Sequence, residues 1–419
     1  DLHLTFNATC EEFVGSCLIH VECKQPLKVL TLNAINTELK FVDAQLQQQK
    51  KWKGSIKIVD DPNTPKLLKL IFSEPLPKGK AVIGLKYKGT VREDGIGIYR
   101  CTQTNSNTKE ASLIISHFEP NFAPLCFPCL IDYSVRTSFA LTLTIPKDLE
   151  AVSCMPIKEQ IESEKEGFQN WSFETTPSIP SYVFGFAIGK FFTEEEQYTS
   201  TSGQVIPMKS YVPLGYYTDS QMKSISKLLL ETAVPALQSL ENYFEIPFWL
   251  PKLDFVAIPN LLFAGMENLG CCFLNALPTA DDWSAVQQVT LHEIAHQWVG
   301  NLVGMSMKMK EGLVQYVEKM FSEKLFGSFQ KKQHRQKNAH ITLSSKKGTQ
   351  ESIRTLLLAD FNASINEDFY QKCLKTVESS VQACGEKEFQ KRLSAALQEH
   401  SEAFMDDSVV EEKVLVATT

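Results

Sequence analysis

Short apolar and β-branched runs, separated by turn signals, fill the first half of the chain. Three of these runs are Thr31–Ile35, Val82–Tyr87 and Phe139–Ile145, and each has the length and composition of a strand. Turn-forming residues at Asp60–Asn63 and Pro77–Gly79 separate such runs. The pattern predicts an antiparallel β domain.

From about residue 215 the apolar positions recur at helical spacing instead. The predicted helices are Asp219–Phe244, Asp282–Val303, Glu311–Leu325 and a charged amphipathic stretch from Asp368 to His400. Leu253–Pro259, between the first two, has the composition of a strand. The sequence therefore predicts a mixed architecture, with an N-terminal antiparallel β domain over residues 1–198 and an α+β domain over residues 199–419.

Composition and charge narrow the classes of protein and partner. At 419 residues, with 43% hydrophobic and 22% charged residues, the chain is an ordinary globular protein too long for one core. A net charge of -7 argues against nucleic acid as the main partner. No uninterrupted apolar stretch is long enough to span a bilayer. The chain begins at Asp1 without Met, as expected of a processed or excised piece.

Three Asn-x-Ser/Thr sequons, at Asn7, Asn170 and Asn362, bear on the compartment. Such sites are used in secreted proteins and ectodomains, but chance alone gives about two in a chain of this length. The sequence therefore slightly favours a cytoplasmic protein, with a secreted or membrane-anchored ectodomain as the alternative. It also leaves the oligomeric state open.

The run His292-Glu293-Ile294-Ala295-His296 is the strongest chemical pattern in the chain. On a helix, side chains four residues apart project from one face, so His292 and His296 can bind a single zinc ion. Glu293 points beside them, where it can take a proton from water activated by the metal. The alternative is that both histidines are ordinary helix residues, because so short a pattern also arises by chance.

A second motif, Ala264-Gly265-Met266-Glu267-Asn268, precedes the predicted zinc helix. Together with His292–His296 it resembles the M1 family of zinc aminopeptidases, the gluzincins related to puromycin-sensitive aminopeptidase. Phe118–Pro120, Phe127–Cys129 and Ser181–Gly189 extend the resemblance through the first half of the chain. It implies a thermolysin-like catalytic domain after the β domain, one zinc ion per chain and peptides with a free N-terminus as substrates.

The resemblance also implies which residues bind the substrate. Glu267 and Glu119 match the family's two acidic positions for the α-ammonium, and a buried carboxylate favours a ligand that brings a cation. The backbone of Ala264, Gly265 and Met266, followed by Asn268, is expected to lie along the substrate as an extra strand, where glycine permits close approach. The plainer alternatives for Glu267 and Glu119 are carboxylates in solvent or at a turn.

The family's catalytic tyrosine matches Tyr370 in the run Tyr370-Gln371-Lys372, although Cys373 replaces the usual glycine. Tyr370 is then expected to donate a hydrogen bond to the oxyanion of the tetrahedral intermediate. The alternative is a tyrosine packed between helices.

The third zinc ligand is less certain in position than the two histidines. The family's ligand is the Glu of an Asn-Glu-Gly, and Lys310-Glu311-Gly312 matches it with lysine in place of asparagine. The connection between Gly304 and Glu311 is four residues shorter than in the family, so the family's spacing from His296 falls on Gln315, a poor zinc ligand. If the connection is a surface excursion, Glu311 still reaches the metal, whereas a packed helical turn would displace it. Glu318 is a fallback ligand.

We expect a zinc aminopeptidase in which His292, His296 and Glu311 hold the metal and Glu293 is the general base. The short connection also supports an alternative, a catalytically weak or inactive homologue that keeps the groove as a peptide-binding module. Further departures from the family, at Ala123–Leu125, Ile131-Asp132 and Leu269, put the order around the site in doubt.

Overall fold

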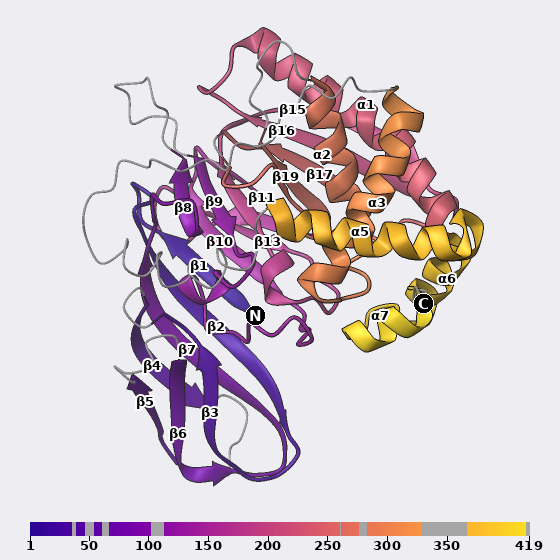
Figure 1. Cartoon of the computed structure of the whole chain (residues 1–419). Helices are drawn as coiled ribbons and strands as arrows, with labels where there is room; N and C mark the ends of the chain where they lie inside the picture. Colours follow the sequence, from indigo (N-terminus) through magenta and orange to yellow (C-terminus); the bar gives the residue numbers. More distant parts are fainter. Residues whose placement is uncertain are drawn as a thin grey trace. The chain divides into compact units, whose positions relative to one another are not determined.

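The predicted change from strands to helices along the chain is present in the computed structural model (Figure 1). The structure describes residues 1–35, 39–46, 54–60, 67–101, 113–259, 261–275, 283–327 and 367–415. The chain divides into two compact units, Asp1–Lys190 and Phe191–Thr419. The first contains strands and short 3-10 turns, and the second contains helices around a mixed sheet. The predicted fold class is confirmed.

Antiparallel pairing dominates the first unit. Its strands are β1 (Leu2–Phe6), β2 (Glu12–Cys23), β3 (Leu27–Asn33), β4 (Lys40–Leu46), β5 (Ile56–Asp60), β6 (Leu67–Leu76), β7 (Gly79–Thr90), β8 (Gly97–Cys101), β9 (Leu113–His117), β10 (Leu141–Pro146), β11 (Glu150–Ser153), β12 (Ile157–Glu162), β13 (Phe168–Phe173) and β14 (Phe186–Gly189). They form sheets in the orders β12-β13-β10-β1-β2-β7-β4, β11-β14-β9-β8 and β3-β6-β5. The pair β1 and β10 is parallel, which the predicted antiparallel pattern did not include.

An aromatic cluster fixes the chain around Glu119 in the first unit. Phe118 follows β9, is fully buried, and stacks on Phe184 with ring centroids 6.3 Å apart. Phe127 meets Phe118 edge-on at 5.5 Å. Glu119 itself is half-buried. The packing of its neighbour therefore holds the backbone at Glu119 in one place.

A five-stranded mixed sheet supports the second unit, with the strand order β15-β16-β17-β19-β18. Its strands are β15 (Phe191–Thr199), β16 (Val205–Pro213), β17 (Leu253–Ala257), β18 (Gly265–Met266) and β19 (Cys271–Leu274). The β17 strand, inside the predicted Leu253–Pro259, is buried throughout and parallel to both neighbours. The short β18 strand is antiparallel to β19 and lies at one edge of the sheet.

The helices of the second unit are α1 (Asp219–Phe244), α2 (Trp283–Ala295), α3 (Met307–Phe326), α5 (Glu367–Cys384), α6 (Glu386–Glu399) and α7 (Asp407–Lys413). Helix α1 has the bounds predicted for it. Its start is fixed by a capping box, in which Thr218 Oγ1 accepts from the Gln221 N–H at 3.3 Å and Gln221 Oε1 accepts from the Thr218 N–H at 2.9 Å.

Helix α2 was predicted to continue to Val303, and this was wrong. It ends at Ala295, after which the chain continues in turns whose N–H groups bond five residues back, as from Asn301 to the His296 carbonyl at 3.1 Å. Gly300, at φ 110°, supplies the left-handed conformation that these turns need. In the same way, the predicted helix 368–400 is two helices separated at Gly385, which has φ 84°.

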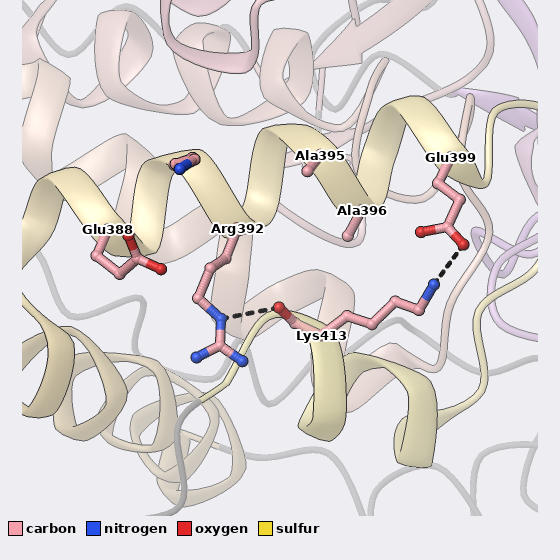
Figure 2. A pocket seen from close by; sticks show the side chains of 7 residues that line it. Glu388, Arg392, Ala395, Ala396, Glu399 and Lys413 are labelled. Atoms are coloured by element: carbon pink, nitrogen blue, oxygen red, sulfur yellow. Dashed lines mark hydrogen bonds and ion pairs between the residues drawn. The ribbon is translucent and has the colours of Figure 1, made fainter.

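Polar contacts join α6 and α7 at the hollow drawn in Figure 2. The Arg392 guanidinium donates to the carbonyls of Lys413 at 3.0 Å and Glu412 at 2.9 Å, and the Lys413 ammonium pairs with Glu399. The guanidinium of Arg392 thus has backbone partners on α7, and the Lys413 ammonium has a carboxylate partner on α6. We therefore regard the hollow as a helix–helix contact.

Two further predictions concern targeting. Among the described residues, no helix is both long and apolar enough to cross a membrane. Asn7 and Asn170 are half-buried, and their side-chain oxygens accept hydrogen bonds from the Glu11 N–H and the Thr144 hydroxyl. The third sequon, at Asn362, lies outside the described residues.

Candidate metal centre and active site

The last turns of α2 bring the two histidines together. One face of the helix is buried, at Thr290, Leu291, Ile294 and Ala295. His292 lies in the last turn of α2, and His296 lies one turn further along the chain. Their Nε2 atoms lie 3.0 Å apart, and the rings meet at 76°. His296 is 1% exposed. The predicted pairing of the histidines on one face is present in the structure.

Helix α3 adds the carboxylate of Glu311 to this pair. The Glu311 Oε2 atom lies 3.5 Å from His292 Nε2, and Oε1 lies 3.5 Å from His296 Nε2. Four ligands about 2.05 Å from a tetrahedral zinc ion lie about 3.3 Å from one another. The Nε2–Nε2 separation of 3.0 Å is close to that edge length, and each Glu311 oxygen lies 3.5 Å from one of the two Nε2 atoms. One ligand atom from each of the three residues lies within 4.8 Å of the others, so together they could hold one metal ion.

The connection between the second histidine and Glu311 answers the question left open by its length. Between Gly304 and Glu311 the connection is buried at Met305, Met309 and Lys310, half-buried at Ser306 and Met307 and exposed only at Lys308, so it is mostly packed and is not a surface excursion. Helix α3 nevertheless begins early, at Met307, after Ser306 Oγ accepts from the Met309 N–H at 3.4 Å. This earlier start places Glu311 beside the histidines. The expectation that a packed connection would displace it was wrong.

Outer hydrogen bonds fix the tautomer of each histidine. His296 Nδ1–H donates to the Val299 carbonyl at 3.0 Å, and His292 Nδ1–H donates to Glu318 Oε2 at 2.8 Å. With each Nδ1 as a donor, each Nε2 is the ring nitrogen left to bind a metal ion or a second proton, and the two Nε2 atoms face each other and a carboxylate. Such a donor set is stable only with a cation or proton among its members. Glu318, predicted as a fallback ligand, lies at the outer nitrogen of His292, where Gln288 also bonds it.

The charge states of His296 and Glu311 are those of metal ligands, whereas His292 holds a proton in the absence of a metal ion. Burial lowers the pKa of His296 to about 4, so its ring is neutral at pH 7. Burial alone would raise the pKa of Glu311, but Lys310 and His296 outweigh it and hold the pKa below its usual range. For His292, burial opposes the charged form, while hydrogen bonds to Glu311 and Glu318 raise the pKa. The raised pKa keeps a proton on His292, and a metal cation in the cluster would replace this proton.

Glu293 stands beside the cluster without a hydrogen bond on one oxygen. It is 4% exposed, and its Oε2 atom has no partner among the described residues. Burial raises the pKa of Glu293 well above its usual range. Its other oxygen lies against Gly265, where an added Cβ would come within 2.1 Å. Glycine at 265 is therefore needed to admit Glu293, a role that the sequence did not reveal.

The Ala264–Asn268 motif, predicted to bind substrate, includes the edge strand β18 and the start of the turn that follows. Gly265 and Met266 pair with Leu274 and Phe273 of β19, and Ala264 accepts a backbone hydrogen bond from Asn275 at 2.9 Å. The outer side of β18 is the side on which an extended peptide can add. Asn268, after the strand, is buried and has no side-chain hydrogen bond to the described residues.

Two amides from the turns that follow α2 hold Glu267 in place. Asn301 Nδ2 donates to the Glu267 carbonyl at 2.8 Å, and Gln297 Nε2 donates to it at 3.3 Å. Glu267 is 3% exposed, so the alternative of a carboxylate in solvent does not hold. The carboxylate forms an ion pair with the fully buried Lys310, whose Nζ also lies 3.2 Å from Glu311 Oε1. Sequence reasoning missed this pair, and the only signal was lysine in place of the family's asparagine.

Tyr370 lies on α5, which packs closely on α3. A Cβ at Gly312 would be 2.8 Å from the Cys373 carbonyl oxygen, so the two backbones nearly touch beside Glu311. Tyr370 precedes Cys373 by three residues and shares its face of the helix. Its ring is half-buried and meets Phe369 at 5.7 Å. Glu119, the other residue predicted to bind the substrate's amine, belongs to the first unit.

Comparisons with known proteins match both units. The Peptidase M1 N-terminal domain matches residues 1–183, and the Peptidase family M1 domain matches residues 228–415. Aminopeptidase M1 of Arabidopsis thaliana is 28% identical over 426 residues, 96% of this chain and 46% of the relative. Puromycin-sensitive aminopeptidase of Caenorhabditis elegans is 28% identical, with 74% of this chain and 33% of the relative aligned.

Endoplasmic reticulum aminopeptidase 2 of Bos taurus is 27% identical over 76% of this chain and 34% of its own length. The chain thus spans less than half the length of these relatives. Two models of one family match the chain in order, one in each unit. The chain belongs to peptidase family M1.

Proposed function

We propose that the chain is a zinc-dependent aminopeptidase that releases N-terminal residues from peptides with a free N-terminus. The observation that carries this proposal is the convergence of His292, His296 and Glu311, whose ligand atoms lie within 4.8 Å of one another, as two imidazoles and a carboxylate that bind one zinc ion would. Membership of the M1 family and the names of the relatives support it. We assign the catalytic groups to residues 199–419 and one amine-binding group, Glu119, to residues 1–198.

His292, His296 and Glu311 are the residues that would hold one zinc ion. When bound, zinc supplies a Lewis acid that polarises the scissile carbonyl and activates water. Glu293 takes the proton of the attacking water on its carboxylate and passes it to the leaving amine nitrogen. Its unbonded, buried oxygen supports this role. Tyr370 donates a hydrogen bond to the oxyanion that develops on the carbonyl oxygen.

Substrate binding in this proposal uses the edge of the sheet. The peptide adds to β18 through backbone hydrogen bonds, with Ala264, Gly265 and Met266 along it and Asn268 at its end. Glu267 and Glu119 bind the terminal ammonium. Lys310 already forms an ion pair with Glu267, so the terminal ammonium has to compete with Lys310 for this carboxylate.

A second candidate function is a catalytically weak or inactive homologue that binds peptides. The ion pair between Lys310 and Glu267 favours it, because the carboxylate that should attract the substrate is already neutralised. The two candidates share the metal centre and differ in turnover.

Zinc content of the purified full chain, together with turnover of aminoacyl fluorogenic amides, tests the proposal. We expect one zinc per chain and measurable release of the fluorophore. Glu311→Ala should weaken zinc binding by more than about a hundredfold, since even the loss of an outer partner costs 10–100-fold. The exposed Glu323 on the same helix provides the control, Glu323→Gln. A zinc-free unaltered chain, or unchanged zinc affinity in Glu311→Ala, would contradict the proposal. Bound zinc without turnover would favour the second candidate.

A further inference from the structure

We propose that Lys310 is an internal competitor for the ammonium subsite, so that a ligand's α-ammonium must displace it from Glu267. The inference rests on the proposed function, since it concerns the same site. It concerns selectivity: the site should bind ligands with and without a free amine about equally well.

The geometry places a cation where the substrate's cation is needed. The Lys310 ammonium lies between the carboxylates of Glu267 and Glu311, and it is 3.2 Å from the Glu311 oxygen that faces His296. The Lys310 side chain is 0% exposed, and those of Glu267 and Glu311 are 4% and 7% exposed. The ammonium thus contacts Glu311, one of the three predicted metal ligands, directly. A substrate whose carbonyl reaches the metal would bring its α-ammonium into the same region.

Electrostatics at low dielectric makes the two cations exclude each other. A buried carboxylate without a partner attracts an ammonium strongly, whereas one already paired gains little from a second cation and brings the two cations into repulsion. The amine of a substrate therefore adds little to its affinity while Lys310 stays in place.

The surroundings of Lys310 keep it there. It lies at the start of α3, where its N–H bonds to the Ser306 carbonyl at 2.9 Å, and it directly precedes Glu311. On the opposite side, Gln297 and Asn301 fix the backbone of Glu267. A lysine rotated away from both carboxylates would lose two ion pairs while its charge stayed buried.

The test compares two zinc-binding probes that differ only in the amine. Leucine hydroxamic acid carries the α-ammonium, and 4-methylpentanohydroxamic acid lacks it. Calorimetric affinities are measured on the zinc-loaded full chain. For the unaltered chain we expect the two affinities to agree within a factor of about three. In Lys310→Asn the preference for the amine should rise at least tenfold, which is about 1.4 kcal/mol.

Two further variants test whether the greater preference for the amine comes from Glu267 and depends on the position of Lys310. Lys310→Asn combined with Glu267→Gln should lose the new preference, because no carboxylate is then left to receive the amine. Lys324→Asn removes a lysine that is 60% exposed at the end of the same helix, and it should behave as the unaltered chain. If Lys310→Asn fails to fold, Glu267→Gln alone is informative: the preference should stay near that of the unaltered chain, since Lys310 already masks Glu267.

The results distinguish a failure of the role assigned to Lys310 from a failure of the proposed metal site. A strong preference for the amine in the unaltered chain, unchanged in Lys310→Asn or abolished in Glu267→Gln alone, would overturn the role of Lys310 and leave the metal centre intact. If neither hydroxamate binds to any folded variant, the proposed metal site fails, and this assignment fails with it.

Discussion

Glu241 and Glu293 are both buried carboxylates of the second unit, with 2% and 4% exposure, yet they are held in opposite ways. Glu241 accepts hydrogen bonds from the Tyr198 and Ser200 hydroxyls and from two backbone N–H groups. Glu293 keeps one oxygen without a hydrogen-bond partner in the part of the chain that the structure describes. Neutral donors surround the first carboxylate, whereas histidines, carboxylates and a lysine surround the second.

The pKa of each group follows from this difference. Burial alone would raise the pKa of Glu241, but its hydrogen bonds stabilise the ionised form and lower the pKa below its usual range. For Glu293 burial dominates, and the pKa rises well above its usual range. A carboxylate with all its donors serves to fix structure, and one without them is available to carry a proton. The comparison can be broken by exchanging each acid for its amide.

The largest effect is expected for Glu293→Gln. Turnover should fall by about a hundred- to ten-thousandfold, because the general base is lost while the shape of the side chain is kept. The metal-free variant should unfold at the same or a higher temperature, because no buried carboxylate remains without a partner. Kinetics on aminoacyl amides and calorimetric melting measure the two effects.

Glu241→Gln is the matched variant for this comparison. It should keep its turnover under conditions in which it is folded, and melt at a lower temperature. If both amides lower turnover to the same extent, the distinction between the two carboxylates is wrong.

Tyr370→Phe tests the next group of the site. Loss of one oxyanion donor costs about 2.7–4 kcal/mol, or roughly a hundred- to a thousandfold in kcat, and zinc content should not change. Tyr316→Phe provides the control, since Tyr316 lies on α3 and packs on Phe389 at 5.4 Å. A Tyr370→Phe variant with the turnover of the unaltered chain would identify Tyr370 as a packing residue.

Glu318→Gln sharpens the comparison at the metal. It keeps the size of the side chain but removes the charge that orients His292, so zinc affinity should fall about 10–100-fold. Competition with a chelator of known affinity measures the change. An effect as large as that of Glu311→Ala would indicate that Glu318 binds the metal directly.

The smallest effect concerns stability and pH. The folded-state pKa of Glu241 is lowered, so its stabilisation is present above the unfolded value of about 4.3 and is lost as pH falls through the folded value. Hydrogen bonds to a charged group are worth about 1.5–3 kcal/mol, which sets the expected loss in Glu241→Gln at pH 7. Urea unfolding measures the free energy of unfolding of the unaltered chain and of Glu241→Gln at pH 7 and at pH 3.5. The difference between these two free energies should be smaller at pH 3.5. A constant difference would contradict this role.

Local patterns predicted the elements that local interactions decide. Helix α1 has its predicted bounds because a capping box and an apolar face agree within one segment. The end of α2 was placed too late, because the apolar spacing of Trp298 and Leu302 continues while the backbone follows a different turn at Gly300. Periodicity reports which side chains are buried and does not distinguish a helix from a sequence of buried turns.

The candidate site divides in the same manner. His292 and His296 lie four residues apart, so the helix alone brings them together. Glu311 depends on where α3 begins, which the packing of the preceding connection decides. The pairing of Lys310 with Glu267 joins residues 43 positions apart, and the sequence showed only a substituted asparagine. Contacts between distant segments could not be read from spacing.

The edges of the sheet in the second unit also bear on how copies of the protein behave together. At one edge β18 consists of Gly265 and Met266 alone, and at the other β15 carries Glu194–Glu196. Strands that are very short or highly charged are poor templates for edge-to-edge pairing, which is a common route to aggregation. At β18 the sheet can therefore pair with a short stretch of peptide backbone, while both edges disfavour pairing with the sheet of a second copy of the chain. Concentrated solutions of the folded chain should resist aggregation through these edges.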